Sequence, residues 1–97
     1  MADGSIATVL DPDGRSVALS EERWAHIVDG HPELRSFRES VLEAVQAPSR
    51  RLPGRSLGEE WFYRAGAGPS RWLKVVVRYD ASDSGRIVTA FARRSLP

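Results

Sequence analysis

The sequence contains no cysteine. This excludes disulfide bonds, and it excludes zinc or iron–sulfur sites held by thiolates. Apolar runs reach only three residues, as in Val75–Val77, far short of the ~20 that a membrane-spanning helix needs. The first residues, Met1–Ser5, have neither the basic nor the apolar segment of a signal peptide. We therefore expect a cytoplasmic protein with no membrane association.

Charge is unevenly distributed along the 97 residues, although the formal net charge is only +1. Residues 1–48 hold four arginines and nine acids, and residues 49–97 hold ten basic residues and four acids. Nine of those ten are arginine, the side chain best suited to forked recognition of phosphate. This asymmetry predicts a basic face that meets an anion. The alternative is a solvated, arginine-rich surface with no ligand.

The first half of the chain predicts a hairpin and then helices. Residues 6–10 are β-prone, Asp11–Gly14 is a strong turn signal, and residues 15–19 can return as a second strand. Ser20 then stands as an N-cap before a helix that Gly30 ends.

A second helix is predicted to start at His31–Pro32 and to end at Ala47–Pro48, because proline suits a first helical position. Its apolar residues recur at helical spacing: Phe37, Val41, Leu42 and Val45. The rest predicts strands, with Arg51–Gly54 as a turn or irregular edge: residues 60–64, 71–79 and 86–92.

These elements predict one domain over residues 1–97, in the order ββ-αα-βββ. It comprises an N-terminal hairpin (1–19), two helices (20–47) and an antiparallel sheet (50–95). The fold class is α+β, with both helices on one face of the sheet.

Strand alternation singles out Lys74. Leu73, Val75 and Val77 are expected to face the helices, which leaves Lys74 in the middle of the opposite face. If the following hairpin opposes Lys74 to Thr89 or a near neighbour, a lysine and a hydroxyl lie side by side. The alternative is a lysine that extends its amine to solvent beside an ordinary strand threonine.

The two histidines, His26 and His31, are the side chains whose unperturbed pKa lies nearest neutrality. Nearby carboxylates can orient an imidazole, and they can equally serve as helix-terminus charges. Their spacing does not match a zinc site, and no glycine loop for a phosphate cofactor is present. We therefore expect no metal and no cofactor.

Histidine, lysine, arginine and a hydroxyl together suit RNA transesterification. A base removes the 2′-hydroxyl proton, an acid protonates the 5′-leaving oxygen, and cations stabilise the phosphate. The nucleophile belongs to the RNA itself, so this chemistry requires no bound metal.

Several short motifs, between about residues 20 and 95, carry a resemblance: Trp24-x-His26-Ile27, His31-Pro32-Glu33, Trp61-Phe62-Tyr63, Trp72-Leu73-Lys74-Val75-Val76-Val77 and Ile87-Val88-Thr89-Ala90-Phe91. In these the chain resembles the phage and polymorphic-toxin branch of the barnase–EndoU–colicin–RelE-like nucleases. The resemblance implies helices followed by a curved antiparallel sheet whose exposed face cleaves RNA without metal. It departs at Phe91–Ala92, where the family usually has a tyrosine or a proline-bearing motif.

The resemblance also implies roles. His26 is the expected general acid or base, with His31 as a second candidate, Lys74 stabilises the pentavalent phosphate, and Thr89 hydrogen-bonds a phosphate oxygen. The expected phosphate-binding arginines are Arg64, Arg71, Arg78 and Arg93.

We thus expect a metal-independent endoribonuclease, a toxin or phage-derived effector that cleaves tRNA or other RNA to a 2′,3′-cyclic phosphate. An acidic antitoxin or immunity protein is a further expected partner. The alternative is a non-catalytic RNA-binding or protein-interaction module that uses the arginine-rich sheet, with Trp61, Tyr63 and Trp72 available to stack bases. The oligomeric state stays open.

Overall fold

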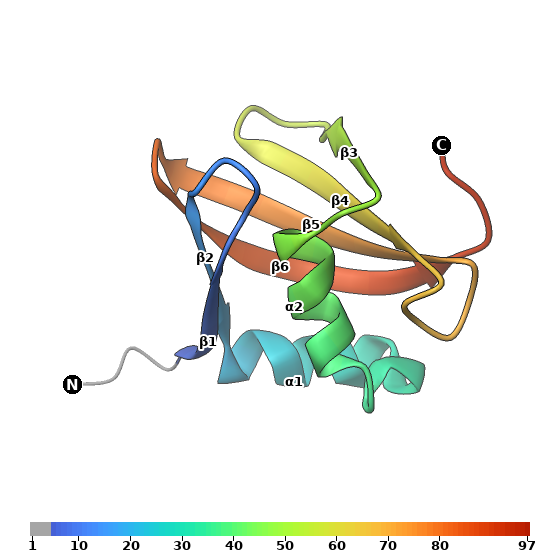
Figure 1. Cartoon of the computed structure of the whole chain (residues 1–97). Helices are drawn as coiled ribbons and strands as arrows, with labels where there is room; N and C mark the ends of the chain where they lie inside the picture. Colours follow the sequence, from blue (N-terminus) through green and yellow to red (C-terminus); the bar gives the residue numbers. More distant parts are fainter. Residues whose placement is uncertain (1–4) are drawn as a thin grey trace.

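A computed structural model describes residues 5–97 (Figure 1). The chain begins with two strands, continues through two helices joined by a short 3-10 helix (η1), and ends with four strands. In order, these elements are β1 (Ser5–Leu10), β2 (Ser16–Ser20), α1 (Glu21–Gly30), η1 (Pro32–Leu34), α2 (Arg38–Gln46), β3 (Arg50–Pro53), β4 (Glu59–Ala65), β5 (Trp72–Ala81) and β6 (Ser84–Arg93). The fold class is α+β, as predicted.

The strands form one six-stranded sheet in the order β1-β2-β6-β5-β4-β3. Neighbouring strands are antiparallel except β2 and β6, which run parallel. The prediction of a purely antiparallel sheet is therefore wrong at this pair. A parallel pair requires a long connection, and the chain between β2 and β6 provides one that includes both helices.

The additional strand is β3, which lies where a turn or irregular edge was expected. It pairs with β4 from Arg50↔Tyr63 to Pro53↔Glu60. Its other side has no partner strand among residues 5–97. An edge position tolerates Pro53, because the missing N–H costs no hydrogen bond to a neighbouring strand.

Helix α1 begins as predicted, with the Ser20 hydroxyl accepting a hydrogen bond from the Arg23 N–H at 3.0 Å. The single second helix predicted from His31–Pro32 is instead split into η1 and α2. The N–H groups of Leu34 and Arg35 bond to carbonyls three residues earlier, as in a 3-10 helix. Phe37, with φ −115° and ψ 23°, then separates this turn from α2.

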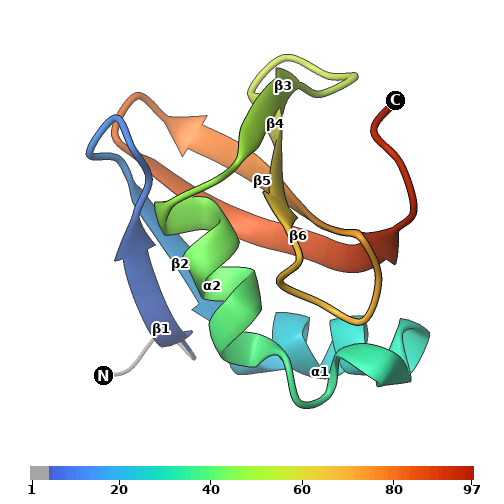
Figure 2. The same ribbon diagram turned by 45° about the vertical axis from the view of Figure 1, so that its right-hand side comes forward.

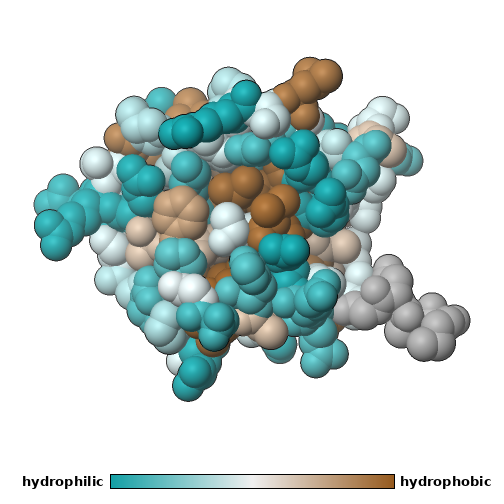
Figure 3. All heavy atoms as spheres, turned by 180° about the vertical axis from the view of Figure 1, so that it is seen from behind, coloured by the Kyte–Doolittle hydropathy of each residue, from teal (hydrophilic) through white to brown (hydrophobic). Residues whose placement is uncertain are grey.

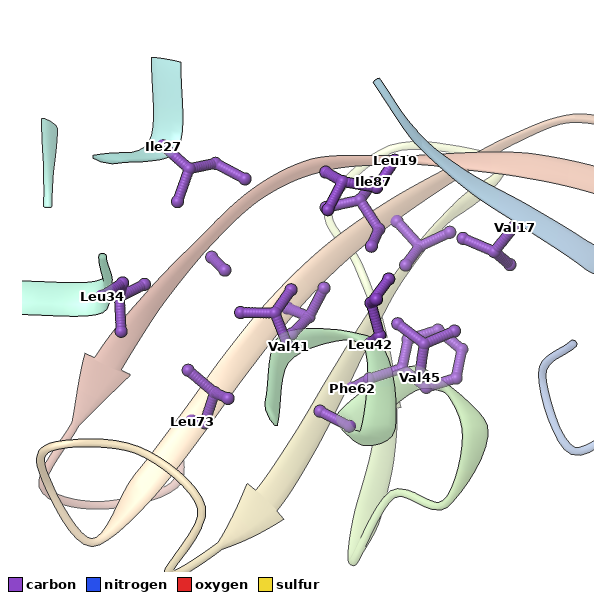
Figure 4. Close-up of a cluster of buried hydrophobic side chains, with 14 residues drawn as sticks. Val17, Leu19, Ile27, Leu34, Val41, Leu42, Val45, Phe62, Leu73 and Ile87 are labelled. Atoms are coloured by element: carbon purple, nitrogen blue, oxygen red, sulfur yellow. The ribbon is translucent and has the colours of Figure 1, made fainter. Parts of the chain in front are cut away.

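The helices and the sheet pack around one hydrophobic core, and Figure 4 shows its buried side chains. Ile27 of α1 and Val41 of α2 are fully buried in it, as is Phe62 of β4. Burial of each such side chain stabilises the fold by about 1.5–3 kcal/mol. Figure 2, turned from the first view, shows α2 lying across the sheet and α1 running beneath it.

The alternation predicted for β5 is confirmed on the helix side. Leu73, Val75 and Val77 are each fully buried in the shared core. The neighbouring β5 residues therefore point to the opposite face of the sheet.

The β1–β2 loop is tied to β4 and β5 by a polar group that we call the Asp11 cluster: Asp11, Arg15, Glu60 and Tyr79. The Tyr79 hydroxyl donates to Asp11 Oδ2 at 2.6 Å, and Arg15 Nε donates to the same oxygen at 2.8 Å. Arg15 Nη2 also donates to Glu60 Oε2 at 2.9 Å. Asp11 is only 4% exposed. Burial alone would raise its pKa, but the hydrogen bonds from Tyr79, Arg15 and Asp13 outweigh burial and lower it.

We predict that Asp11→Asn lowers the free energy of unfolding at pH 7 by about 1–3 kcal/mol, because it removes a charged acceptor from a buried network. A lowered carboxyl pKa stabilises the fold above the unfolded pKa, and this contribution is lost as pH falls through the folded value. The difference between wild type and variant should therefore shrink below about pH 4. Urea unfolding at pH 7 and pH 3 measures it. Asp83→Asn, at an exposed side chain, is the control, and equal effects from both substitutions would contradict the prediction.

Candidate functional site

The face of the sheet opposite α2 is built from alternate residues of β4, β5 and β6, as the register shows. We call it the open face. Its residues are Glu59, Trp61, Tyr63, Ala65, Trp72, Lys74, Val76, Arg78, Arg86, Thr89, Phe91 and Arg93. Figure 3, seen from behind the first view, shows hydrophobic atoms gathered near the centre of this side and ringed by hydrophilic ones.

Lys74 lies at the centre of the open face and is only 7% exposed. Its Nζ is 3.6 Å from the centroid of the Trp61 ring, 5.3 Å from that of Phe91 and 5.7 Å from that of Tyr63. An ammonium held against aromatic faces gains cation–π attraction, which offsets part of the cost of its burial.

The surroundings of Lys74 disfavour its charge. Burial lowers the pKa of its amine most, the nearby cations Arg93 and Arg55 lower it further, and Glu59 opposes the shift. The Lys74 side chain as a whole is mostly buried, with its amine lying over aromatic rings. Arg55 lies in the loop between β3 and β4, and its influence was not foreseen from the sequence.

Thr89 shares the open face with Lys74, but the two are not directly opposed. Lys74 pairs with Phe91, and Thr89 pairs with Val76, one diagonal step away. An irregularity follows at once, since Val77 next to Val76 pairs with Ile87. This leaves Val88 as the extra residue on β6, as in a β-bulge. Lys74 and Thr89 are thus diagonal neighbours on one face of the sheet, and they are not a directly opposed pair.

His31 reaches the open face from the end of α1. Its imidazole stacks on Phe91, with ring centroids 5.4 Å apart and an interplanar angle of 25°. Its side chain is 38% exposed, and Nδ1 lies 3.7 Å from Glu33 Oε2. The Phe91 ring is therefore close to both the imidazole and the amine of Lys74, its register partner.

The incomplete pairing of β6 explains this approach. The β2–β6 pairing covers only Ser84–Arg86 of β6. Helix α1 contacts β6, and Arg23 Nη1 approaches the Val88 carbonyl oxygen at 3.5 Å beyond the paired part. The C-terminal end of α1 therefore lies at the edge of the open face, and His31 follows it there.

His26 is placed differently. It lies three residues after Arg23, on the same side of α1, and its side chain is exposed. Within residues 5–97 it makes no hydrogen bond, ion pair or ring contact. The structure brings His31, rather than His26, into the contacts around Phe91.

The four expected phosphate-binding arginines fall in different places. Arg78 and Arg93 lie on the open face. Arg64 lies on the helix side, where it donates to the Ala47 carbonyl and approaches Glu43. Arg71 is exposed in the segment before β5.

Trp61 and Glu59 form a link that the sequence interpretation did not single out. Trp61 Nε1 donates to Glu59 Oε2 at 2.7 Å, and Arg78 Nη2 lies 3.5 Å from Glu59 Oε1. The alternation Glu59-x-Trp61-x-Tyr63 was the available signal, since it places all three on one face. Tyr63 is 1% exposed, so its ring is covered and the expectation that it stacks bases loses support.

Among the described residues, no group of three or more histidine, aspartate and glutamate side chains is arranged to hold a metal ion. No helix within residues 5–97 combines the length and apolar character needed to cross a membrane. No family model, curated protein or solved structure matches the chain.

We predict that the Lys74 amine titrates below the 10.5 of an unperturbed lysine. It is the only lysine in the chain, so lysine-selective isotope labelling gives a single side-chain signal whose pH titration measures the value. The unfolded chain then binds more protons between the two pKa values, and stability should rise with pH across that window. Lys74→Met should abolish this rise, and a titration at or above 10.5 would contradict the assignment.

Proposed function

We propose that the chain is a metal-independent endoribonuclease, a toxin or phage-derived effector that acts on tRNA or other RNA in the cytoplasm. One observation carries the proposal: the Lys74 amine and the His31 imidazole both lie beside the Phe91 ring, and Thr89 shares the open face two residues before Phe91 on β6. The resemblance to the barnase–EndoU–colicin–RelE-like nucleases supports the same activity from sequence motifs.

Each group has a role in the proposed cleavage. An imidazole removes the proton of the RNA 2′-hydroxyl, the 2′-oxygen bonds to phosphorus, and the bond to the 5′-oxygen breaks as that oxygen takes a proton from an acid. The Lys74 ammonium stabilises the phosphate charge, and the Thr89 hydroxyl donates to a phosphate oxygen. Geometry favours His31 over His26 as the imidazole at the reacting centre, because only His31 contacts the open face.

The arrangement of cations supports an anionic polymer as substrate. Arg93 lies beside Phe91, with its guanidinium carbon 5.9 Å from the ring centroid. Arg55 is close enough to lower the pKa of Lys74. A backbone crossing the open face at Lys74 would therefore come close to two further cations. An acidic antitoxin or immunity protein would bind the same face, and it would compete with RNA.

We expect the purified chain to cleave total RNA equally with and without EDTA and to leave 2′,3′-cyclic phosphate ends. Lys74→Ala and His31→Ala should each reduce cleavage by about 10²- to 10³-fold, and His26→Ala should reduce it less. End-group analysis and cleavage rates measure these outcomes.

The control is Arg38→Ala, which removes an exposed arginine at the start of α2. Full activity in Lys74→Ala would overturn the site, and a larger loss in His26→Ala than in His31→Ala would reverse the histidine assignment.

One observation favours a second candidate, a non-catalytic RNA-binding module. The rings of Trp61, Trp72 and Phe91 are partly exposed on a face that also carries arginines. Two of these rings, Trp61 and Phe91, also lie next to the Lys74 amine. Such a face can stack unpaired bases. This candidate requires salt-sensitive RNA binding with no cleavage by the wild-type chain.

A further inference from the structure

The side chain of Glu59 is held more tightly than an exposed carboxylate at the start of a strand. It is 16% exposed, and each of its oxygens has its own partner. Oε2 accepts the Trp61 indole N–H at 2.7 Å, and Oε1 lies 3.5 Å from Arg78 Nη2.

The backbone of Gly54 closes another side of Glu59. A Cβ atom built at Gly54 would lie 2.4 Å from Glu59 Cγ and 2.8 Å from its Cβ and Cδ. The two residues are also joined by a hydrogen bond of 2.8 Å, from the Gly54 N–H to the Glu59 carbonyl. Gly54 does not have a positive φ, so space for Glu59, and not backbone conformation, is what glycine provides here.

The held carboxylate acts on Lys74 in two ways. Its hydrogen bond sets the plane of the Trp61 indole, whose face lies 3.6 Å from Lys74 Nζ. Its charge also favours the ammonium form, against the opposing influence of Arg93 and Arg55.

We infer that Glu59 is a positioning residue for Lys74: it fixes the Trp61 indole against the amine and holds the amine where a phosphate oxygen would meet it. The inference rests on the proposed ribonuclease function for its consequence in catalysis. Glu59 itself touches no substrate. Its effect reaches the reaction through the orientation of Trp61 and the protonation of Lys74.

The unique lysine allows a test by side-chain NMR of the full-length chain labelled at lysine. Wild-type Lys74 should show the ring-current shift of a methylene and amine lying over an indole face. Glu59→Ala should reduce this shift and lower the pKa of the amine. Glu59→Gln keeps an acceptor for the indole N–H, so it should preserve the ring-current shift while lowering the pKa.

Glu60→Gln is the matched control. Glu60 is next to Glu59 in sequence and also pairs with arginines. Its partners are Arg15, in the Asp11 cluster, and Arg51, on β3, and neither of them contacts Trp61 or Lys74 in the way that Glu59 does. It should leave both the shift and the pKa of Lys74 unchanged. Unaltered Lys74 signals in a folded Glu59→Ala chain would overturn the inference.

Cleavage kinetics supply the second measurement. Glu59→Ala should reduce kcat by about ten-fold or more, with a smaller change in KM. Displacing a catalytic group lowers the rate of the chemical step more than it weakens substrate binding. The loss should not add to that of Trp61→Phe, which removes the same hydrogen bond. Additive losses would overturn the route through Trp61. If the wild-type chain cleaves no RNA, the ribonuclease proposal fails, whereas the NMR outcome still decides the role of Glu59.

Discussion

The period of two along β5 is the constraint on which the rest of the structure depends. Its odd-numbered residues include Leu73, Val75 and Val77, which are buried in the core beneath α2. The even-numbered residues must then face the other way, and Lys74 falls between β4 and β6 with ring-bearing residues as neighbours, Tyr63 on one side and Phe91 on the other. A one-residue slip in this register would bury Lys74 in the helix-side core and expose the valines. The same hydrophobic pattern that stabilises the fold therefore determines the position of the amine.

Features set by neighbours in sequence could be predicted, and features set by distant segments could not. Ser20 capping α1 and the buried face of β5 depend on local chemistry and periodicity, and both were foreseen. The parallel β2–β6 pair joins residues about 70 positions apart, such as Ser16 and Ser84, and no local signal encodes it. The position of His31 follows from that pair. The β2–β6 pairing ends at Arg86, and α1 then contacts the later part of β6.

The same division holds within the candidate site. Alternation placed Lys74 and Thr89 on one face, but the bulge at Val88 decided which residue stands opposite the lysine. Charge counting foresaw a basic half of the chain, yet several of its arginines are engaged by carboxylates. Arg51 bonds Glu60 and approaches Asp13, Arg64 approaches Glu43, and Arg86 bonds Asp80. The sequence therefore overstated the cations available to an anion, because ion pairing depends on the fold.

Lys74 and Asp11 show opposite uses of burial. Asp11 is buried among donors that outweigh its desolvation, so its charge stabilises the fold. Lys74 is buried, and the charges of Arg93 and Arg55 repel its ammonium as well, so the pKa of the amine is lowered although Glu59 and the neighbouring aromatic rings favour the charged form. An apolar side chain at this position would avoid that cost. A cation kept under such conditions, next to a phenylalanine ring that also stacks on an imidazole, is the kind of perturbed group that functional sites contain. Stability explains the charge of Asp11 and does not explain that of Lys74, and this contrast is why the proposed site is placed on the open face.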